Sequence, residues 1–234
     1  MCGRYSLSTP DDVLAALLGV VGWPGRKPRW NIAPTQDVPI ARMGDNNHRE
    51  ATFAHWGLIP HWADDPSIGS RMINARSETV ASKPAFRDSF KKRRCLIPAD
   101  SFFEWAKLPS GQKQPMLVRL KDKSPMVFAG LWTRWDKGDE PIESCTILTT
   151  SANDKLRPLH DRMPLILHPR SFSTWLDPER TEEHRLRGVM QPYESDELEV
   201  HPVSARVNSP KNDTPEVVEP VATNVAPGEQ GQLW

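Results

Sequence analysis

The chain has 234 residues, enough to bury a hydrophobic core without the help of disulfide bonds. It carries 30 basic and 30 acidic residues, so its net charge is zero and bulk electrostatics gives no sign of a nucleic-acid partner. Its three cysteines are too few and too widely spaced for a disulfide framework or a zinc finger, which favours a reducing, cytoplasmic compartment. No apolar run reaches the ~20 residues of a membrane span, so no membrane association is expected.

Proline is roughly twice as frequent as the usual ~5%, which favours a single loop-rich domain of the α+β or mostly-β class. A helix is expected to start with a hydroxyl cap near Ser8 and to end at Gly19. Glycine and proline in residues 22–37 predict a loop. Alternating or β-branched runs predict strands at 38–42, 50–56, 94–98, 102–107, 114–120, 126–132, 144–150, 165–167 and 199–203.

Short helices are expected between these strands and in the C-terminal third of the chain, at 77–81, 84–90, 171–175 and 179–186, with a helical turn at 152–157. Residues 57–71 are expected to form a loop with an exposed Trp62. The chain loses its periodicity from Asn208 onward. We therefore expect one domain at residues 1–221 and a disordered tail at 222–234.

The first residues, Met1-Cys-Gly-Arg-Tyr5, contain an unusual chemical possibility. If Met1 is removed, Cys2 carries a free α-amine and a thiol on adjacent carbons. An aldehyde that meets this aminothiol forms an imine with the amine and then takes the sulfur at the same carbon, which closes a five-membered thiazolidine ring. Amine and thiol have ordinary pKa values of about 8 and 8.5, so both are partly deprotonated near neutral pH. The alternative is an ordinary buried cysteine, which is common.

Several polar residues stand beside predicted strands, where a hydrophobic core would not require them. Glu104 lies in an aromatic strand, so burial would raise its pKa and suit it to acid–base catalysis. The alternative interpretation is that Glu104 faces solvent on an alternating strand and has no catalytic role. His160, Asn74, Arg76 and Arg162 have equally ordinary alternatives as capping, loop-stabilising or salt-bridging side chains.

A series of short motifs resembles one known family, the SOS response-associated peptidase (SRAP) family, from residue 1 to about residue 221. The motifs, in chain order, are Met1-Cys-Gly-Arg-Tyr5, Trp30-Asn-Ile-Ala-Pro-Thr-Gln36, Trp56-Gly-Leu-Ile-Pro60, Ile73-Asn-Ala-Arg-Ser-Glu78, Cys95-Leu-Ile-Pro-Ala-Asp100, Phe103-Glu-Trp105, Ile147-Leu-Thr-Thr150, Leu159-His-Asp-Arg-Met-Pro164 and His201-Pro-Val-Ser204. The resemblance implies the SRAP fold: a single α+β domain of mostly antiparallel sheets curled into a barrel-like core, with short flanking helices.

The resemblance also implies a sensor that captures abasic sites in single-stranded DNA by a covalent thiazolidine. Met1 would be lost and Cys2 would form the cross-link. Asn74 would orient the sugar or the amine, Glu104 would be the acid and base, and His160 would help to open the deoxyribose ring.

The expected DNA contacts come from the same resemblance, as do the expected partners. The DNA-binding residues would be Arg4, Asn31, Trp62, Arg76, Thr149 and Arg162; the three arginines among them would hold phosphates, and Trp62 would stack on a base. The loop after Trp56 has one tryptophan where some members have two, which leaves the strength of stacking open. Neither a cofactor nor a metal ion is implied, and the protein is expected to be a monomer, associated with the nucleoid if bacterial.

Three rival functions remain open at this stage. The first is a thiol peptidase that uses Cys2 and His160, chiefly to cleave the Met1–Cys2 bond of its own chain. The second is a non-covalent module that binds single-stranded DNA and uses Cys2 only structurally. The third, a metal hydrolase, finds little support because the histidines lack the spacing of metal ligands.

Overall fold

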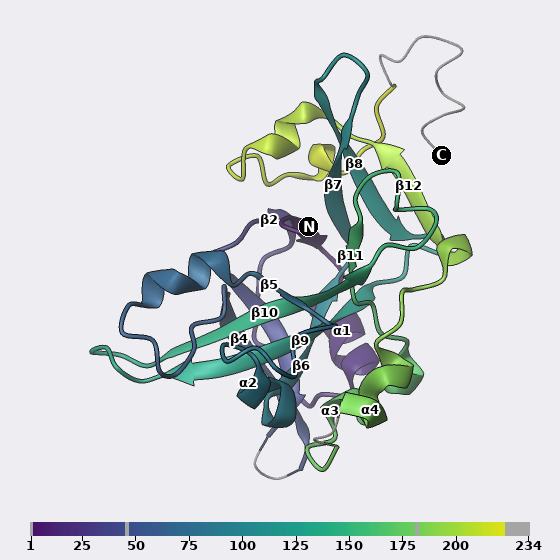
Figure 1. The fold of residues 1–234 in the computed structure, drawn as a ribbon. Helices are drawn as coiled ribbons and strands as arrows, with labels where there is room; N and C mark the ends of the chain where they lie inside the picture. Colours follow the sequence, from purple (N-terminus) through teal and green to yellow (C-terminus); the bar gives the residue numbers. More distant parts are fainter. Residues whose placement is uncertain (1, 45–46, 181–182, 223–234) are drawn as a thin grey trace.

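The predicted α+β fold with a barrel-like core is confirmed by the computed structural model, which describes residues 2–44, 47–180 and 183–222 (Figure 1). Five strands close into a barrel, because β10 pairs with β9 on one edge and with β4 on the other. The barrel strands are β3 (Asp37–Met43), β4 (Arg49–Trp56), β6 (Arg94–Ala99), β9 (Met126–Trp135) and β10 (Ile142–Ser151).

Two very short strands extend the barrel at the end of β10. β5 (Asn74–Arg76) pairs with β10 in parallel, with Asn74 opposite Ile147, and β11 (Arg162–Pro164) pairs antiparallel, with Arg162 opposite Ser151. Neither strand was predicted, since three residues are too few to show a period of two. They carry three of the candidate site residues, Asn74, Arg76 and Arg162, to one end of the barrel.

A second, antiparallel sheet stands beside the barrel in the strand order β12-β8-β7-β1-β2. Its strands are β1 (Tyr5–Leu7), β2 (Arg29–Ile32), β7 (Ser101–Lys107), β8 (Lys113–Leu120) and β12 (Leu198–Pro202). β2 lies within the predicted loop 22–37, and so that prediction is wrong for four residues. The chain passes from β6 in the barrel to β7 in this sheet with only Asp100 between them. The two sheets therefore adjoin at this junction, where Asp100 also binds Ser8 and Thr9 near the N-terminus.

Short helices cover the outside of the two sheets (Figure 1). The α-helices are α1 (Asp11–Leu18), α2 (Arg87–Lys92), α3 (Phe172–Leu176) and α4 (Glu183–Leu186). The 3-10 helices are η1 (Pro66–Arg71), η2 (Pro169–Ser171), η3 (Arg187–Val189), η4 (Ser195–Glu197), η5 (Ala205–Asn208) and η6 (Pro215–Val217). The helix predicted at 77–81 is a series of turns, and the strand predicted at 165–167 is one isolated bridge at Ile166.

Helix α1 ends as predicted but begins differently. Gly19 adopts a left-handed conformation with φ of 64°, which caps the last turn. At the other end the cap residue is Pro10, without a side-chain bond. The hydroxyl groups of Ser8 and Thr9 donate instead to the carboxylate of Asp100. The expected hydroxyl cap is therefore wrong: Asp100 holds the backbone N–H and hydroxyl groups of both residues before the helix, and the cap position falls to Pro10.

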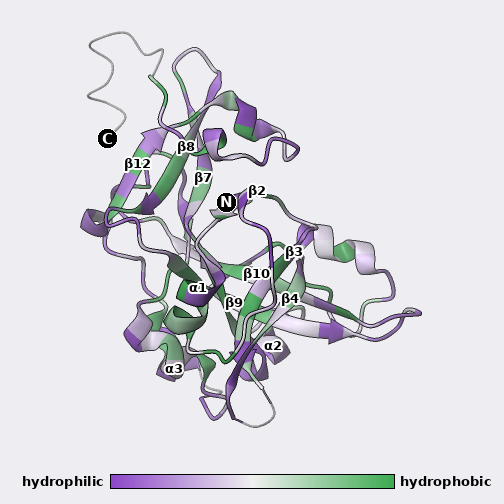
Figure 2. Ribbon diagram, turned by 180° about the vertical axis from the view of Figure 1, so that it is seen from behind, coloured by the Kyte–Doolittle hydropathy of each residue, from purple (hydrophilic) through white to green (hydrophobic). Residues whose placement is uncertain are grey.

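The core lies inside the barrel and between the barrel and the helices, where apolar residues gather on the strands (Figure 2). Tyr5 sends its ring into the barrel, edge-on to Trp56 at 5.3 Å and to Phe128 at 6.0 Å between ring centres. Such pairs add to the free energy that apolar burial already provides. The N-terminal segment is thus anchored in the core three residues after Cys2.

None of the described helices has the length and apolar character needed to cross a bilayer. The predicted domain boundary at residue 221 stays a prediction, and the predicted disordered tail lies, from residue 223 onward, outside the described residues.

The loop that carries Trp62 is closed by two glycines in mutual contact. Gly57 has a φ of 144°, and a Cβ placed on it would lie 2.6 Å from the carbonyl oxygen of Gly69. A Cβ on Gly69 would lie 2.5 Å from the carbonyl oxygen of Gly57. Beyond this contact Ala63 packs with Trp135, whose indole N–H donates to the Ala63 oxygen at 2.8 Å. Trp62 itself is 46% exposed, as predicted.

We predict that Gly57→Ala lowers the free energy of unfolding by about 3 kcal/mol, because both backbone strain and a backbone clash must be relieved. Gly111→Ala is the matched control: Gly111 also has a positive φ, of 83°, but open space around it, so only the strain applies. Urea unfolding of both variants measures the difference. Equal losses for the two variants would show that the contact between Gly57 and Gly69 contributes nothing.

Candidate functional site

Cys2 is fully buried where the barrel and the second sheet meet. Its carbonyl oxygen accepts a hydrogen bond from the side-chain Nδ2 of Asn74, at 2.9 Å, which ties it to β5 on the barrel. Two residues later the carbonyl of Arg4 accepts from the backbone N–H of Phe103 on β7, at 3.0 Å. The segment before β1 is therefore held from both sides.

One side-chain atom of Asn74 makes no hydrogen bond to the described residues. Its Oδ1 is buried and has no hydrogen-bond partner among the described residues, although Nδ2 is used for Cys2. A buried carbonyl oxygen without a donor is costly, so each case calls for an explanation. Here the oxygen adjoins the backbone of Cys2 and can accept a hydrogen bond from an amine or a sugar hydroxyl bound there.

Glu104 lies on β7 and is only 6% exposed, which rules out the solvent-facing alternative. Burial raises the pKa of its carboxyl group, and the nearby imidazole of His160 partly opposes that rise. Burial also raises the pKa of the Cys2 thiol far above its usual range, and the charge of Glu104 adds to this effect. Cys2, Glu104 and His160 therefore lie within electrostatic reach of one another.

His160 is positioned by its own loop, just before β11. Its Nδ1 accepts the backbone N–H of Arg162 at 2.9 Å, which places the proton of the neutral ring on Nε2. The carboxylate of Asp161 also lies 2.8 Å from this Nδ1. The side chain is about one-third exposed to solvent, and it lies near enough to the buried carboxyl group of Glu104 to lower the pKa of that group.

Arg162 is held almost entirely inside the protein. It donates to both carboxylate oxygens of Glu78, at 2.6 and 2.8 Å, and to the carbonyl oxygen of Thr149 at 2.6 Å. The Arg162 side chain is 10% exposed, whereas that of Glu78 is 47% exposed. Hydrogen bonds from Arg162 lower the pKa of Glu78, so the pair is charged at neutral pH. Thr149 is fully buried and contacts Arg162 through its backbone.

Arg4 has a different environment, made of neutral oxygens. It donates to Asn31 Oδ1 at 2.8 Å and to the carbonyl oxygen of Val207 at 2.7 Å, and its guanidinium lies 5.9 Å from the centre of the Trp105 ring. Asn31 is fully buried, so its expected contact with DNA would have to act through Arg4. Arg76 on β5 is exposed, as a phosphate-binding side chain would need to be.

The segment after β12 was missed by the sequence analysis, which found only lost periodicity there. Its signal is a run of turn-forming polar residues from Asn208 to Asp213. Glu78 was part of a quoted motif but had no role assigned, and the structure supplies one as the partner of Arg162. Trp105 also belonged to a quoted motif without an assigned role, and its ring faces the guanidinium group of Arg4.

A second group of ligand-type side chains lies on other elements. His168 Nε2 and the carboxylates of Glu194 and Glu197 approach within 4.8 Å of one another. They are satisfied by one another and by Tyr193, since His168 pairs with Glu194 at 2.9 Å and the Tyr193 hydroxyl donates to Glu197 at 2.8 Å. Tyr193 and Glu197 also line an apolar cavity of about 530 Å³ that shares no residue with the Cys2 site.

Known proteins resemble this chain over most of its length. The family model described as SOS response associated peptidase (SRAP) matches residues 1–210. The abasic site processing protein YoqW of Bacillus subtilis is 41% identical over 94% of this chain and 99% of its own. YedK of Escherichia coli, with the same description, is 32% identical over 94% of this chain and 100% of its own.

More distant relatives and solved structures agree. The abasic site processing protein HMCES of Xenopus tropicalis is 30% identical over 92% of this chain and 77% of its own. A crystal structure of a protein from Bacteroides thetaiotaomicron superimposes with a TM-score of 0.85 at 25% identity, over 94% of this chain and 100% of that one. With its fold, its motifs and a family match over 210 residues, the chain belongs to the SRAP family.

Proposed function

We propose that this protein captures abasic sites in single-stranded DNA through a covalent bond to Cys2, once Met1 has been removed. The similar proteins are named abasic site processing proteins in bacteria and vertebrates, which supports damaged DNA as the substrate. The observation that carries the covalent step is the position of Cys2. Its backbone is held by Asn74 beside the buried carboxyl group of Glu104.

The reaction begins with the sugar. An abasic deoxyribose is mostly a closed hemiacetal, and opening it to the aldehyde requires a proton to move from the hydroxyl at C1′ to the ring oxygen. His160 suits this step because one nitrogen is fixed by its loop and the other can exchange a proton. The open aldehyde then lies against the α-amine of Cys2, and holding the two together supplies most of the rate.

The amine attacks the aldehyde, and the resulting carbinolamine loses water to give an imine. Glu104 would support this loss, because burial raises its pKa and so favours the protonated form, which can donate to the leaving hydroxyl. The thiol then adds to the imine: a carbon–sulfur bond forms, the C=N bond becomes single, and the thiol proton passes through the Glu104 carboxylate to nitrogen. One water is released overall, and nothing is oxidised or reduced.

The burial of the thiol argues against the rival function of a general thiol peptidase. A peptidase cysteine attacks as the thiolate, which a low pKa favours, whereas burial here raises the pKa of Cys2. Attack by the amine first, followed by addition of a neutral thiol, does not need a thiolate. We therefore limit any peptidase activity to the removal of Met1 from the same chain.

DNA affinity in this proposal comes from a few cations and one aromatic ring rather than from net charge. Arg4, Arg76 and Arg162 would bind phosphates, with Asn31 and Thr149 acting as positioning residues for Arg4 and Arg162. Trp62 would stack on a base. One protomer supplies all these groups, so the proposed active form is a monomer that acts on DNA in the cytoplasm.

The first prediction concerns Cys2. Cys2→Ala and Cys2→Ser both keep the α-amine but lack the thiol, so with an oligonucleotide that contains one abasic site each should form no stable product and stop at a slow, reversible imine that borohydride can trap. Denaturing gels measure the product, and the mass of the N-terminal peptide should equal peptide plus sugar minus one water. A stable adduct of Cys2→Ala formed without borohydride at the wild-type rate would exclude the scheme. A wild-type protein that binds this oligonucleotide without forming any adduct would leave the non-covalent DNA-binding module as the better account.

The second prediction concerns the rate and Glu104. Glu104→Gln should slow cross-linking by about 10²–10⁴-fold, the usual worth of a general acid–base group. In the wild type the rate of imine formation should fall as pH rises through the raised pKa of Glu104, because the acid form is lost. Single-turnover rates across pH measure this fall, and it should be missing from Glu104→Gln. A variant whose rate still falls in the same pH range would assign the acid to another group.

The third prediction concerns stability, and its sign follows from the same shift. A carboxyl group whose pKa is raised by folding contributes stability below its ordinary value of 4.5, and that contribution is lost as pH rises through the folded-state pKa. Glu104→Gln should therefore gain stability over the wild type progressively above pH 4.5. Thermal melts from pH 4 to 8 measure the difference, with the exposed Glu140→Gln as control. A difference that is constant with pH would contradict the burial effect.

A further inference from the structure

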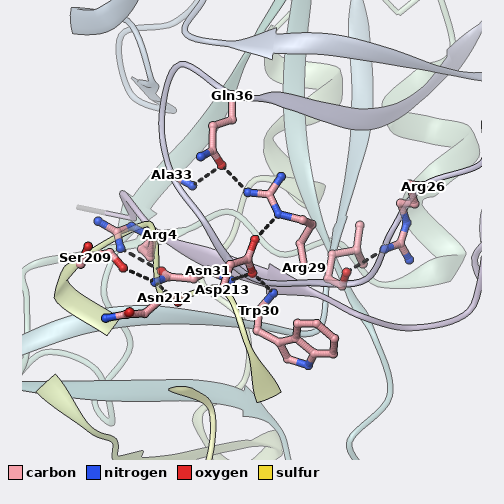
Figure 3. Close-up of polar contacts among 11 residues, drawn as sticks. Arg4, Arg26, Arg29, Trp30, Asn31, Ala33, Gln36, Ser209, Asn212 and Asp213 are labelled. Atoms are coloured by element: carbon pink, nitrogen blue, oxygen red, sulfur yellow. Dashed lines mark hydrogen bonds and ion pairs between the residues drawn. The ribbon is translucent and has the colours of Figure 1, made fainter. Parts of the chain in front are cut away.

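Residues 205–217, here called the C-terminal strap, cover the open edge of β2 (Figure 3). β2 is the last strand of its sheet, so its outward N–H groups have no neighbouring strand to bind. The carboxylate of Asp213 takes their place: Oδ1 accepts from the backbone N–H of Trp30 at 2.5 Å and of Asn31 at 2.8 Å. Its other oxygen accepts from Nε of Arg29.

The strap is bound a second time through the side chain of Asn31. The amide nitrogen of Asn31 lies 3.1, 3.0 and 2.8 Å from the carbonyl oxygens of Val207, Ser209 and Asn212. Below the strap, Val207 and Val217 are buried against the second sheet. The strap therefore has a polar clamp on β2 and an apolar anchor on the sheet.

The clamp determines where Arg4 points. Both acceptors of Arg4 belong to it, since one is Asn31 Oδ1 and the other is the Val207 carbonyl of the strap itself. The Trp105 ring below Arg4 is also fixed by the strap, because its indole N–H donates to Asn208 at 2.7 Å. Figure 3 shows Arg4, Asn31 and the strap residues converging from separate parts of the chain.

Arg4 is also left with its full charge. No carboxylate in the described part of the chain lies within ion-pair distance of it, and both oxygens that it binds are neutral. Arg162, by contrast, is neutralised by Glu78. A cation that is already oriented and has no counter-ion loses little side-chain entropy, and no ion pair, when an anion binds. Arg4 therefore has the properties of a prepared phosphate site.

We propose that Asp213 is a positioning residue for DNA binding: by clamping the C-terminal strap on β2, it fixes the two oxygens that aim Arg4 at a phosphate of the bound strand. The inference rests on the proposed function, in which Arg4 binds a phosphate. Asp213 repels DNA by its own charge, so an effect through Arg4 and an effect through net charge have opposite signs.

The experiment uses the full chain and a single-stranded oligonucleotide with a tetrahydrofuran abasic analogue, which has no aldehyde and so reports non-covalent binding. The dissociation constant is measured by fluorescence anisotropy over a range of salt concentrations. Arg4→Ala should reduce the slope of log affinity against log salt by about 0.7, the value for one phosphate contact on a single strand. Asp213→Asn should change the slope in the same direction, and the double variant should fall no further than Arg4→Ala.

The matched control is Glu216→Gln, which makes the same charge change in the same strap at an exposed side chain. It should leave the slope unchanged and leave the affinity equal or higher. Partial unfolding does not imitate the expected result, because an inactive fraction shifts every dissociation constant by one factor and leaves the slope alone. Asp213→Glu keeps the charge, displaces the carboxylate by one methylene and should give a smaller change in the same direction.

Two outcomes separate this inference from the proposed function. If Arg4→Ala lowers the slope but neither Asp213 variant does, the clamp does not position Arg4 and the inference is overturned. If Arg4→Ala leaves the slope unchanged, Arg4 binds no phosphate, and that part of the proposed function fails together with the inference. Independent, additive effects of Arg4→Ala and Asp213→Asn would also overturn the positioning role.

Discussion

The hydrogen bond from the Asn74 side chain to the Cys2 carbonyl is the contact on which the rest of the site depends. A chain terminus usually frays, because few contacts offset its conformational entropy. Here residue 2 is tied to the barrel through Asn74, residue 4 is tied to β7, and residue 5 is anchored in the barrel core. Residues 2–5 are thereby held on both sides, and the proposed reaction needs such support because it uses an α-amine in a fixed position.

The cations of the site differ in how they are compensated. Arg162 is bound on two sides by Glu78 and Thr149, so any phosphate must share it with a carboxylate that is already present. Arg4 has only neutral partners, and Arg76 is exposed. In the proposed function, a protein with zero net charge binds DNA through a few placed guanidinium groups rather than through its bulk charge. We expect such binding to be modest in strength and sensitive to salt.

The sequence predicted the long elements and the motif residues, because both carry strong local signals. Strands of six residues or more show their alternation, and a motif such as Leu159-His-Asp-Arg-Met-Pro164 names its polar residues directly. The strands β1, β2, β5 and β11 were missed, since three or four residues are too few for a period.

The strap was missed for another reason: its role depends on Asp213 replacing a neighbouring strand, a contact made across more than 180 residues of sequence. Whether Glu104 faces inward or outward was likewise undecided by alternation, and only the packing of β7 against the rest of the sheet resolved it.

The burial of Glu104 and Cys2 together explains why the site is arranged in this way. Burial raises the pKa of both weak acids, and the charge of Glu104 raises that of the Cys2 thiol further. A protonated carboxyl group can donate to a leaving hydroxyl, and a neutral thiol does not oxidise or attack other electrophiles as a thiolate does. When the carboxyl group has given up its proton it becomes the base that the thiol then needs. A buried carboxyl group such as that of Glu104 is unfavourable for folding, and functional sites are where such exceptions are expected. In the proposed reaction, the burial of Glu104 serves two steps, because one group acts first as an acid and then as a base.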